Sequence, residues 1–167
     1  MIENKAFLEM LEQYKKLIYK IASSYCSSHE DRKDLVQEIV VQLWRSFSKY
    51  DQKHKMSTWI YRIALNVSIS FYRKEVKRKK RSARFPEAII ENVAEKEKGE
   101  ELEANLQILN QFIAQLQPLD KALMVLYLEK RSHEEMADIL GISKSNVATK
   151  ISRIKTQLKK QFEQINR

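Results

Sequence analysis

Apolar residues recur at alternating intervals of three and four through most of the chain, the spacing that gathers side chains on one face of an α-helix. The first of these stripes predicts a long helix that must pack against a neighbour, because its apolar face is unbroken. The stripe consists of Phe7, Leu11, Tyr14, Ile18, Ile21 and Tyr25. A second helix is expected over residues 32–48 after an N-cap at Ser28 or Asp31, and a third after an N-cap at Ser57.

Two further helices are predicted in the C-terminal half of the chain. A stripe of apolar residues marks the first, and Pro118 begins the second, since proline is favoured in the first turn of a helix. The stripe consists of Leu102, Leu106, Leu109, Ile113 and Leu116. Only two glycines and two prolines occur in 167 residues, which argues against an all-β fold and against a glycine-rich phosphate loop. The expected fold class is therefore all-α, with two small helical domains.

Residues 132–160 have the pattern of a helix-turn-helix. Ser132 and Glu135 are spaced as a capping box, and Gly141 stands where the first helix must end in a left-handed backbone conformation. Ser143 can cap the second helix, which is basic and would fit the major groove of DNA. The residues predicted to face inward on that helix are Val147, Ile151, Ile154 and Leu158. The alternative is an ordinary helical hairpin with a solvated basic face.

Charge is unevenly distributed along the chain. The formal net charge of +9 favours a polyanionic partner, either nucleic acid or a membrane surface. Residues 73–84 carry lysines and arginines against a single acid, whereas residues 85–103 are mainly acidic. The acidic stretch is typical of a linker. It divides the chain into one domain over residues 1–84 and another over residues 104–167.

The sequence predicts neither secretion nor membrane insertion. The start, MIENKAFLEML, lacks the basic and then apolar pattern of a signal peptide, and no apolar run approaches membrane-spanning length. A single cysteine, Cys26, excludes an internal disulfide framework and a cysteine-cluster metal site. We therefore expect a soluble, cytoplasmic protein.

The third predicted helix carries a polar and basic stripe opposite its apolar face. Trp59, Tyr61 and Tyr72 interleave with the cations of this segment. Cations that follow a phosphate backbone and rings that stack on bases, at about 1–3 kcal/mol per base, are the combination that single-stranded nucleic acid requires. For Trp59, packing in the protein core is the favoured role. For Tyr61 and Tyr72, core packing and base stacking both stay open. The stripe consists of Arg62, Asn66, Ser70, Arg73 and Lys77.

The second predicted helix is apolar on two sides. Gln37, Val41 and Trp44 lie away from the expected core face and are flanked by Asp34 and Glu38. An apolar patch with a polar rim is typical of a protein-binding surface. The alternative is that the first helix covers Trp44, and periodicity alone favours that alternative.

Catalytic chemistry has no support in the sequence. The three histidines, His29, His54 and His133, are scattered, and each stands beside charged loop or capping residues. No HExxH, GxSxG or GK[ST] motif occurs, and no Cys/His spacing suits a metal. We therefore expect a protein that is not an enzyme and that needs no cofactor.

Three segments taken together resemble a known family. These are DLVQEIVVQLW at residues 34–44, MSTWIYRIALNVSISFYRK at residues 56–74, and the helix-turn-helix at residues 132–160. They resemble bacterial sigma factors of the sigma-70 family, specifically the extracytoplasmic-function group, which has only regions 2 and 4. The resemblance covers nearly the whole chain in the right order. It implies a subunit that binds core RNA polymerase, recognises the −10 and −35 promoter elements and assists promoter melting.

The resemblance also implies which residues form each surface. Core polymerase, through its clamp coiled coil, would be bound by Asp34, Leu35, Gln37, Glu38, Val41 and Trp44. The −10 element would be recognised and melted by Trp59, Tyr61, Arg62, Asn66, Ser70, Arg73, Lys74 and Lys77. The −35 element would be read by Lys144, Ser145, Asn146, Thr149, Lys150 and Arg153. The polymerase flap, duplex and single-stranded promoter DNA, and an anti-sigma factor complete the implied partners.

Three positions depart from the family pattern. Ser70 stands where an acidic residue is common, Lys130 stands where glycine usually precedes the helix-turn-helix, and Asn146 stands where threonine is usual. The first departure bears on −10 contacts, and the last bears on the −35 sequence that is read. Asn66, with the loop at residues 52–56, is implied to hold a base flipped out of the non-template strand.

Two other classes of protein stay open from the residues alone. A helix-turn-helix repressor or activator would bind operator duplex without polymerase, and it would need neither the patch around Trp44 nor the stripe around Asn66. A nucleic-acid-processing enzyme would grip its substrate with the basic helix. It would also need a carboxylate or metal cluster, which the sequence does not contain.

Overall fold

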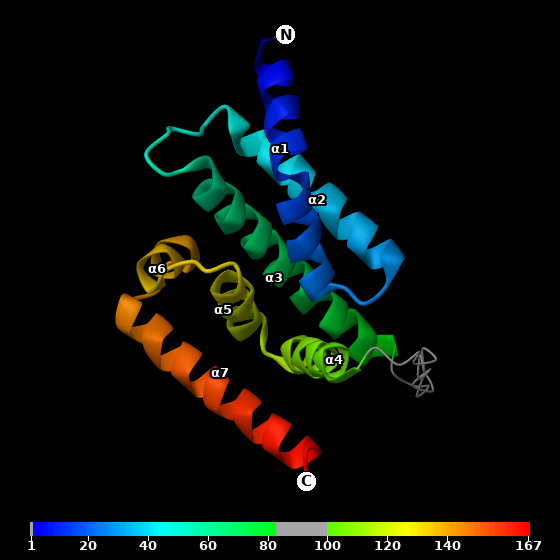
Figure 1. Ribbon diagram of the computed structural model, residues 1–167. Helices are drawn as coiled ribbons and strands as arrows, with labels where there is room; N and C mark the ends of the chain where they lie inside the picture. Colours follow the sequence, from blue (N-terminus) through cyan, green and yellow to red (C-terminus); the bar gives the residue numbers. More distant parts are fainter. Residues whose placement is uncertain (1, 83–99) are drawn as a thin grey trace.

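The computed structural model describes residues 2–82 and 100–167, and every regular element in these ranges is an α-helix, which confirms the all-α class. The N-terminal domain consists of α1 (Ile2–Tyr25), α2 (His29–Phe47) and α3 (Met56–Ser82). The C-terminal domain consists of α4 (Glu100–Gln115), α5 (Pro118–Leu128), α6 (His133–Leu140) and α7 (Lys144–Ile165) (Figure 1). Residues 85–99 of the predicted linker lie outside the described residues, and its last part already belongs to α4.

Aliphatic and aromatic side chains hold the three helices of the N-terminal domain together. The fully buried ones include Ile18, Ile21, Leu35, Ile39, Leu43, Ile60 and Leu65. A cluster of rings also joins the helices. Phe7 lies edge-on to Trp44 and Phe47, with ring centroids 4.9 and 5.3 Å apart, and Phe47 lies 6.3 Å from Trp59. Each such pair contributes about 0.5–1.5 kcal/mol beyond the area it buries.

One predicted N-cap of the N-terminal domain is confirmed and one is wrong. Ser28 caps α2, because its extended backbone lets the side-chain oxygen accept the Asp31 N–H at 3.1 Å. Ser57 does not cap α3. The helix begins at Met56, and the Lys55 carbonyl already accepts the Trp59 N–H at 3.1 Å, so Ser57 lies inside the first turn.

The predicted helix-turn-helix is formed by α6 and α7. The capping box is present in both directions, with Ser132 Oγ accepting the Glu135 N–H at 3.1 Å and Glu135 Oε2 accepting the Ser132 N–H at 2.9 Å. Gly141 ends α6 in a left-handed conformation (φ 67°, ψ 33°), and Ser143 Oγ accepts the Asn146 N–H at 3.1 Å. These bonds satisfy orphan backbone groups at the ends of both helices. Side chains buried on the two helices are Met136, Ile139, Val147, Ile151 and Ile154.

The two domains pack directly against each other. α5 and α6 lie beside α3, and α4 and α5 contact α1 (Figure 1). α7 lies on the side of α5 that faces away from α3 (Figure 1). The hydrophobic pattern predicted a core for each domain, but it did not predict this docking.

Candidate nucleic-acid and polymerase interfaces

The recognition helix α7 presents its predicted −35 residues on the outside of the molecule. Burial of Val147, Ile151 and Ile154 fixes the helix on α5 and α6, so the opposite side faces solvent. The exposed members of the predicted set are Lys144, Ser145, Asn146, Thr149 and Arg153. Lys150 is half-buried, and its Nζ lies 3.5 Å from a carboxylate oxygen of Asp120. The structure therefore brings five of the six predicted residues onto one open face.

The α2 surface presents most of the predicted polymerase-binding residues. Asp34, Gln37 and Glu38 are exposed, and the side chains of Val41 and Trp44 are 47% and 45% exposed. The first helix does cover part of Trp44, because Phe7 packs against one edge of its ring. The alternative, that α1 covers Trp44, therefore holds in part, and the remainder of the residue stays exposed.

A groove of about 680 Å³ runs beside this surface, between α2 and α3. Its α2 wall includes Asp34, Gln37, Glu38 and Val41, and its α3 wall includes Phe71 and basic residues of the same helix. Leu35 is a correction to the predicted set. Its side chain is 0% exposed and belongs to the core of the N-terminal domain, so it offers a partner no surface.

The structure divides the predicted −10 residues of α3 into two groups. Asn66, Ser70, Arg73, Lys74 and Lys77 are exposed along one side of the helix. Trp59 is half-buried between Phe47 and Tyr50, in agreement with the favoured core role. Tyr61 and Arg62 instead face the C-terminal domain. The predicted −10 surface is therefore open over its C-terminal part and covered near its start.

Tyr61 is 1% exposed, and the Arg131 guanidinium of the C-terminal domain lies 5.0 Å above its ring centroid. Burial raises the pKa of the Tyr61 phenol, and the Arg131 charge opposes part of that rise. Arg62 donates a hydrogen bond of 2.8 Å to the Asp138 carbonyl, in the last turn of α6. That carbonyl has no partner within its own helix, and the negative end of the helix dipole favours a cation there.

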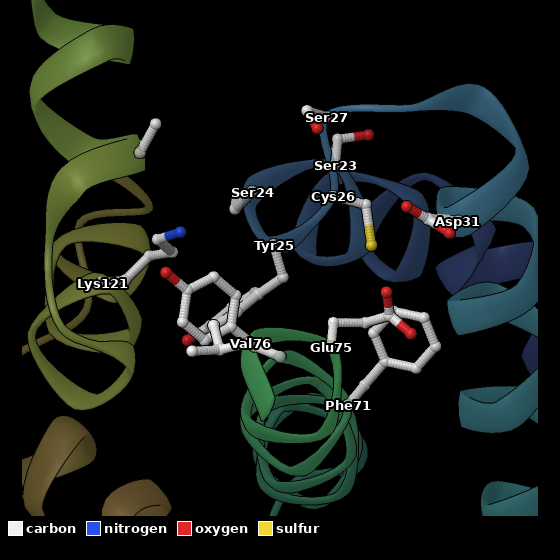
Figure 2. Close-up of a pocket in the computed structure, with 12 residues that line it drawn as sticks. Ser23, Ser24, Tyr25, Cys26, Ser27, Asp31, Phe71, Glu75, Val76 and Lys121 are labelled. Carbon is white, nitrogen blue, oxygen red and sulfur yellow. The ribbon is translucent and has the colours of Figure 1, made fainter. Parts of the chain in front are cut away.

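A second cation of the C-terminal domain, Lys121, lies beside Tyr25 of the N-terminal domain (Figure 2) and also near the ring of Tyr72. Lys121 Nζ lies 5.2 Å from the Tyr25 ring centroid and 4.8 Å from that of Tyr72. The Lys121 side chain is 3% exposed, and burial lowers its pKa. Tyr25 also donates a hydrogen bond of 2.9 Å to the Pro118 carbonyl. Beside these groups lies a cavity of about 380 Å³, which Cys26 and Glu75 also line.

Sequence reasoning missed both cations at this interface. The available signal for Lys121 is a single lysine inside the apolar helix PLDKALMVLYL. Arg131 stands next to the Ser132 N-cap and gave no signal of its own. Lys121 is buried and Arg131 is half-buried, and each places its charge against tyrosine rings, a placement that periodicity does not reveal.

No group of three or more His, Cys, Asp or Glu side chains within residues 2–82 and 100–167 is arranged to hold a metal ion. No helix in the described part of the chain is long and apolar enough to cross a membrane.

A helix-turn-helix with an exposed basic second helix, joined to a helical domain with another basic helix, is the architecture of a DNA-binding protein. Comparison with known families gives the same division. Residues 10–78 match Sigma-70 region 2, and residues 106–158 match Sigma-70, region 4.

Known proteins of similar sequence and fold extend this match over almost the whole chain. The chain is 26% identical to the ECF RNA polymerase sigma factor SigW of Bacillus subtilis (strain 168), over 98% of this chain and 92% of the relative. It is 28% identical to the sigma factor YlaC of the same organism, over 78% of this chain and 77% of that one.

Two solved structures share the fold. The sigma factor RpoE in complex with the anti-sigma factor NepR from Bartonella quintana has a TM-score of 0.71, with 22% identity over 95% of this chain and 98% of that chain. CnrH in complex with the cytosolic domain of CnrY has a TM-score of 0.68, with 19% identity over 96% and 89% of the two chains. The chain belongs to the sigma-70 family of bacterial RNA polymerase sigma factors, in its extracytoplasmic-function group.

Proposed function

We propose that the chain is a dissociable specificity subunit of RNA polymerase, which binds core polymerase, recognises the −10 and −35 elements and assists promoter melting. The observation that carries this function is the presence of both sigma-70 regions in one chain, in order. A repressor or activator of the helix-turn-helix class needs only the second. Such a subunit acts by binding rather than by catalysis, and it works in the cytoplasm, where bacterial polymerase transcribes.

The α2 surface is the proposed site for core polymerase. Exposed apolar area at Val41 and Trp44, surrounded by Asp34, Gln37 and Glu38, has the apolar centre and polar rim of a protein interface. The groove beside it would receive side chains of the clamp coiled coil. Two carboxylates at this surface also make it unattractive to DNA phosphates, although the whole chain carries a formal charge of +9.

Promoter recognition is proposed to divide between the domains. On α7, Arg153 and Asn146 present donors and acceptors of the kind that read base edges in a major groove, and the lysines of the same face neutralise phosphates. On α3, Asn66 would hydrogen-bond an unstacked base while Lys74 and Lys77 follow the backbone of the opened strand. Tyr61 would offer its ring for stacking.

An anti-sigma factor is the remaining proposed partner. Both solved structures described above are complexes with another protein, and in one of them a sigma factor is bound to a protein named as an anti-sigma factor. A chain that binds polymerase through an exposed surface can be kept inactive by a protein that covers that surface. Co-expression with candidate binders and recovery of a stable complex would identify such a partner.

Reconstitution with core polymerase tests the proposed function. The wild-type chain should support transcription from promoters selected out of a random DNA library, whereas Trp44→Ala should weaken core binding. Loss of the ring pair with Phe7 should lower stability by only about 0.5–1.5 kcal/mol, and circular dichroism checks that the variant is folded. Tyr19→Ala is the matched control, because Tyr19 is an equally exposed aromatic residue, at 45%, on α1. A chain that protects an operator by itself and never associates with polymerase would instead be a conventional regulator.

A second pair of variants tests the division between the domains. Arg153→Ala should weaken binding to a −35 duplex by about 1–3 kcal/mol, the usual value of a base-reading arginine. Asn66→Ala should leave duplex binding unchanged and slow strand opening on a closed promoter, with less effect on a pre-opened template. Lys160→Ala, which removes an equal charge from an exposed position later on α7, controls for electrostatics. Equal losses for Asn66→Ala on both templates would contradict this division.

A further inference from the structure

Lys150 lies on the inner flank of the recognition helix α7 and not on its open face. It stands three residues after Val147 and four before Ile154, both of which are buried, and residues at these intervals share one side of a helix. Its side chain is 25% exposed, whereas Thr149 and Arg153 are exposed. The helix itself therefore turns Lys150 partly away from a duplex that would lie on the open face.

Asp120 of α5 holds the ammonium group of Lys150 in this position. Lys150 Nζ lies 3.5 Å from Asp120 Oδ1, and the Asp120 side chain is 28% exposed. Asp120 stands in the first turn of α5, where the positive end of the helix dipole also favours a carboxylate. The backbone of α5 is held in place, because residues 121–126 are all buried. Two partly shielded charges at this distance attract each other more strongly than a fully exposed pair.

The other lysines of α7 differ from Lys150 in this respect. Lys150 is the one lysine of α7 that forms an ion pair within the described part of the chain. Lys155 also contacts α5, with its Nζ 4.4 Å from the ring centroid of Tyr127, but its side chain stays exposed. Because a tyrosine ring is neutral, the charge of Lys155 is not offset there. The charge of Lys150 is offset by a carboxylate.

Contact with a DNA phosphate would require Lys150 to leave Asp120. A lysine contributes to duplex binding by neutralising a phosphate and releasing its counterion. Lys150 already has an anionic partner, so the exchange of one anion for another gains little. The exchange would also leave the Asp120 carboxylate unpaired close to the DNA, where it repels phosphates. Both effects favour an intact Asp120–Lys150 pair while a duplex lies on α7.

We propose that Asp120 is a positioning residue that withholds Lys150 from DNA phosphates, so that α7 binds duplex DNA with one cation fewer than its sequence suggests. This inference rests on the proposed function, because it takes the open face of α7 as the −35 contact. Asp120 limits the sequence-independent attraction to phosphates. A larger share of recognition is thereby left to base-reading side chains such as Arg153, and the subunit dissociates more readily from DNA that lacks its promoter.

Equilibrium binding of the full-length chain to duplex DNA at several salt concentrations tests the proposal. Fluorescence anisotropy is measured with a −35 duplex selected from a random library and with a scrambled duplex of the same length. Asp120→Asn should free Lys150, and Glu163→Gln is the matched control, because it removes the same charge from an exposed position near the end of α7. Lys150→Gln is then combined with Asp120→Asn, and Lys160→Gln is combined with it as the control that removes an equal cation. Circular dichroism checks that each variant is folded.

Asp120→Asn should bind both duplexes about threefold more tightly than the wild type at 50 mM salt, and this gain should largely disappear at 200 mM. The reason is that one additional phosphate contact steepens the slope of log affinity against log salt concentration by about 0.9. Addition of Lys150→Gln should abolish the gain, whereas addition of Lys160→Gln should leave most of it.

Two single variants in the wild-type background give a second measurement. Lys150→Gln should leave the salt slope unchanged, because Lys150 does not contact phosphate while Asp120 is present. Lys144→Gln, which removes an exposed lysine of the open face, should make the slope shallower by about 0.9. A change of helix stability alone would not produce this difference in slope.

Two results would overturn the proposal. One is an Asp120→Asn variant that binds duplex DNA no more tightly than Glu163→Gln does. The other is a shallower salt slope for Lys150→Gln alone, since Lys150 would then contact phosphate in the presence of Asp120. This second result does not depend on the folding of Asp120→Asn, because Lys150→Gln leaves α5 unaltered. A wild-type chain that shows no preference for a selected duplex and no transcription with core polymerase would contradict the proposed function instead, and the scrambled duplex would still decide the role of Asp120.

Discussion

Replacement of Gly141 by alanine isolates the backbone contribution of the turn in the helix-turn-helix. Gly141 has φ 67° and ψ 33°, the left-handed conformation in which an L side chain is strained. A Cβ built at this position meets no heavy atom within 4 Å, so steric collision adds nothing. The whole effect of Gly141→Ala should therefore come from φ, at about 1–2 kcal/mol.

Thermal unfolding followed by circular dichroism measures this effect. For a chain of this size, about 1 kcal/mol corresponds to roughly 2–4 °C, so Gly141→Ala should lower the Tm by about 2–8 °C. Gly141→Asn is the matched control, because asparagine tolerates the left-handed region far better than alanine while adding a larger side chain. It should lose only a small part of what alanine loses.

The comparison has a clear refuting result. If Asn and Ala lower the Tm equally, the loss comes from added atoms or altered hydration and not from φ. If neither lowers it, the turn relaxes into another conformation. In that case the angle between α6 and α7 would change, and binding to a −35 duplex would fall although stability did not.

Three further predictions follow from local features. Lys130 has φ 57°, so Lys130→Gly should raise stability by about 0.5–1 kcal/mol in denaturant unfolding, whereas Lys130→Ala, which keeps the strain, should not. Ser132→Ala should lower stability by about 0.5–2 kcal/mol by removing the α6 capping box, and Ser132→Asp should recover most of it. Burial and the nearby Asp31 raise the pKa of the Cys26 thiol from 9.0 to about 11, so at pH 8 iodoacetamide should react about 100-fold more slowly with the folded chain than with the urea-unfolded chain. The stability that the protonated Cys26 contributes is present below pH 9.0 and is lost as the pH rises through about 11; equal alkylation rates at pH 8 would contradict the burial argument.

The sequence by itself determined the helices and their ends, since these depend on neighbours only three or four residues away. The apolar residues at alternating intervals of three and four predicted which face of each helix is buried. The capping box at Ser132, the turn at Gly141 and the cap at Ser28 all occur as predicted. The error at Ser57 has the same local origin, because Ser57 lies one residue inside a helix that starts without it. Resemblance to a family supplied the roles of the surfaces, which periodicity cannot.

Only the tertiary structure decided which predicted site residues are accessible. Leu35 lies under α2 and not on its surface, and Tyr61 lies beneath Arg131 of the other domain. The contacts that join the two domains link residues far apart in the chain. Arg62 and Asp138 are 76 positions apart, Tyr25 and Pro118 are 93 apart, and Lys20 and Glu129 are 109 apart. Helical period and capping carry no information about pairs so distant, because the docking depends on the shapes and charges of two finished domains.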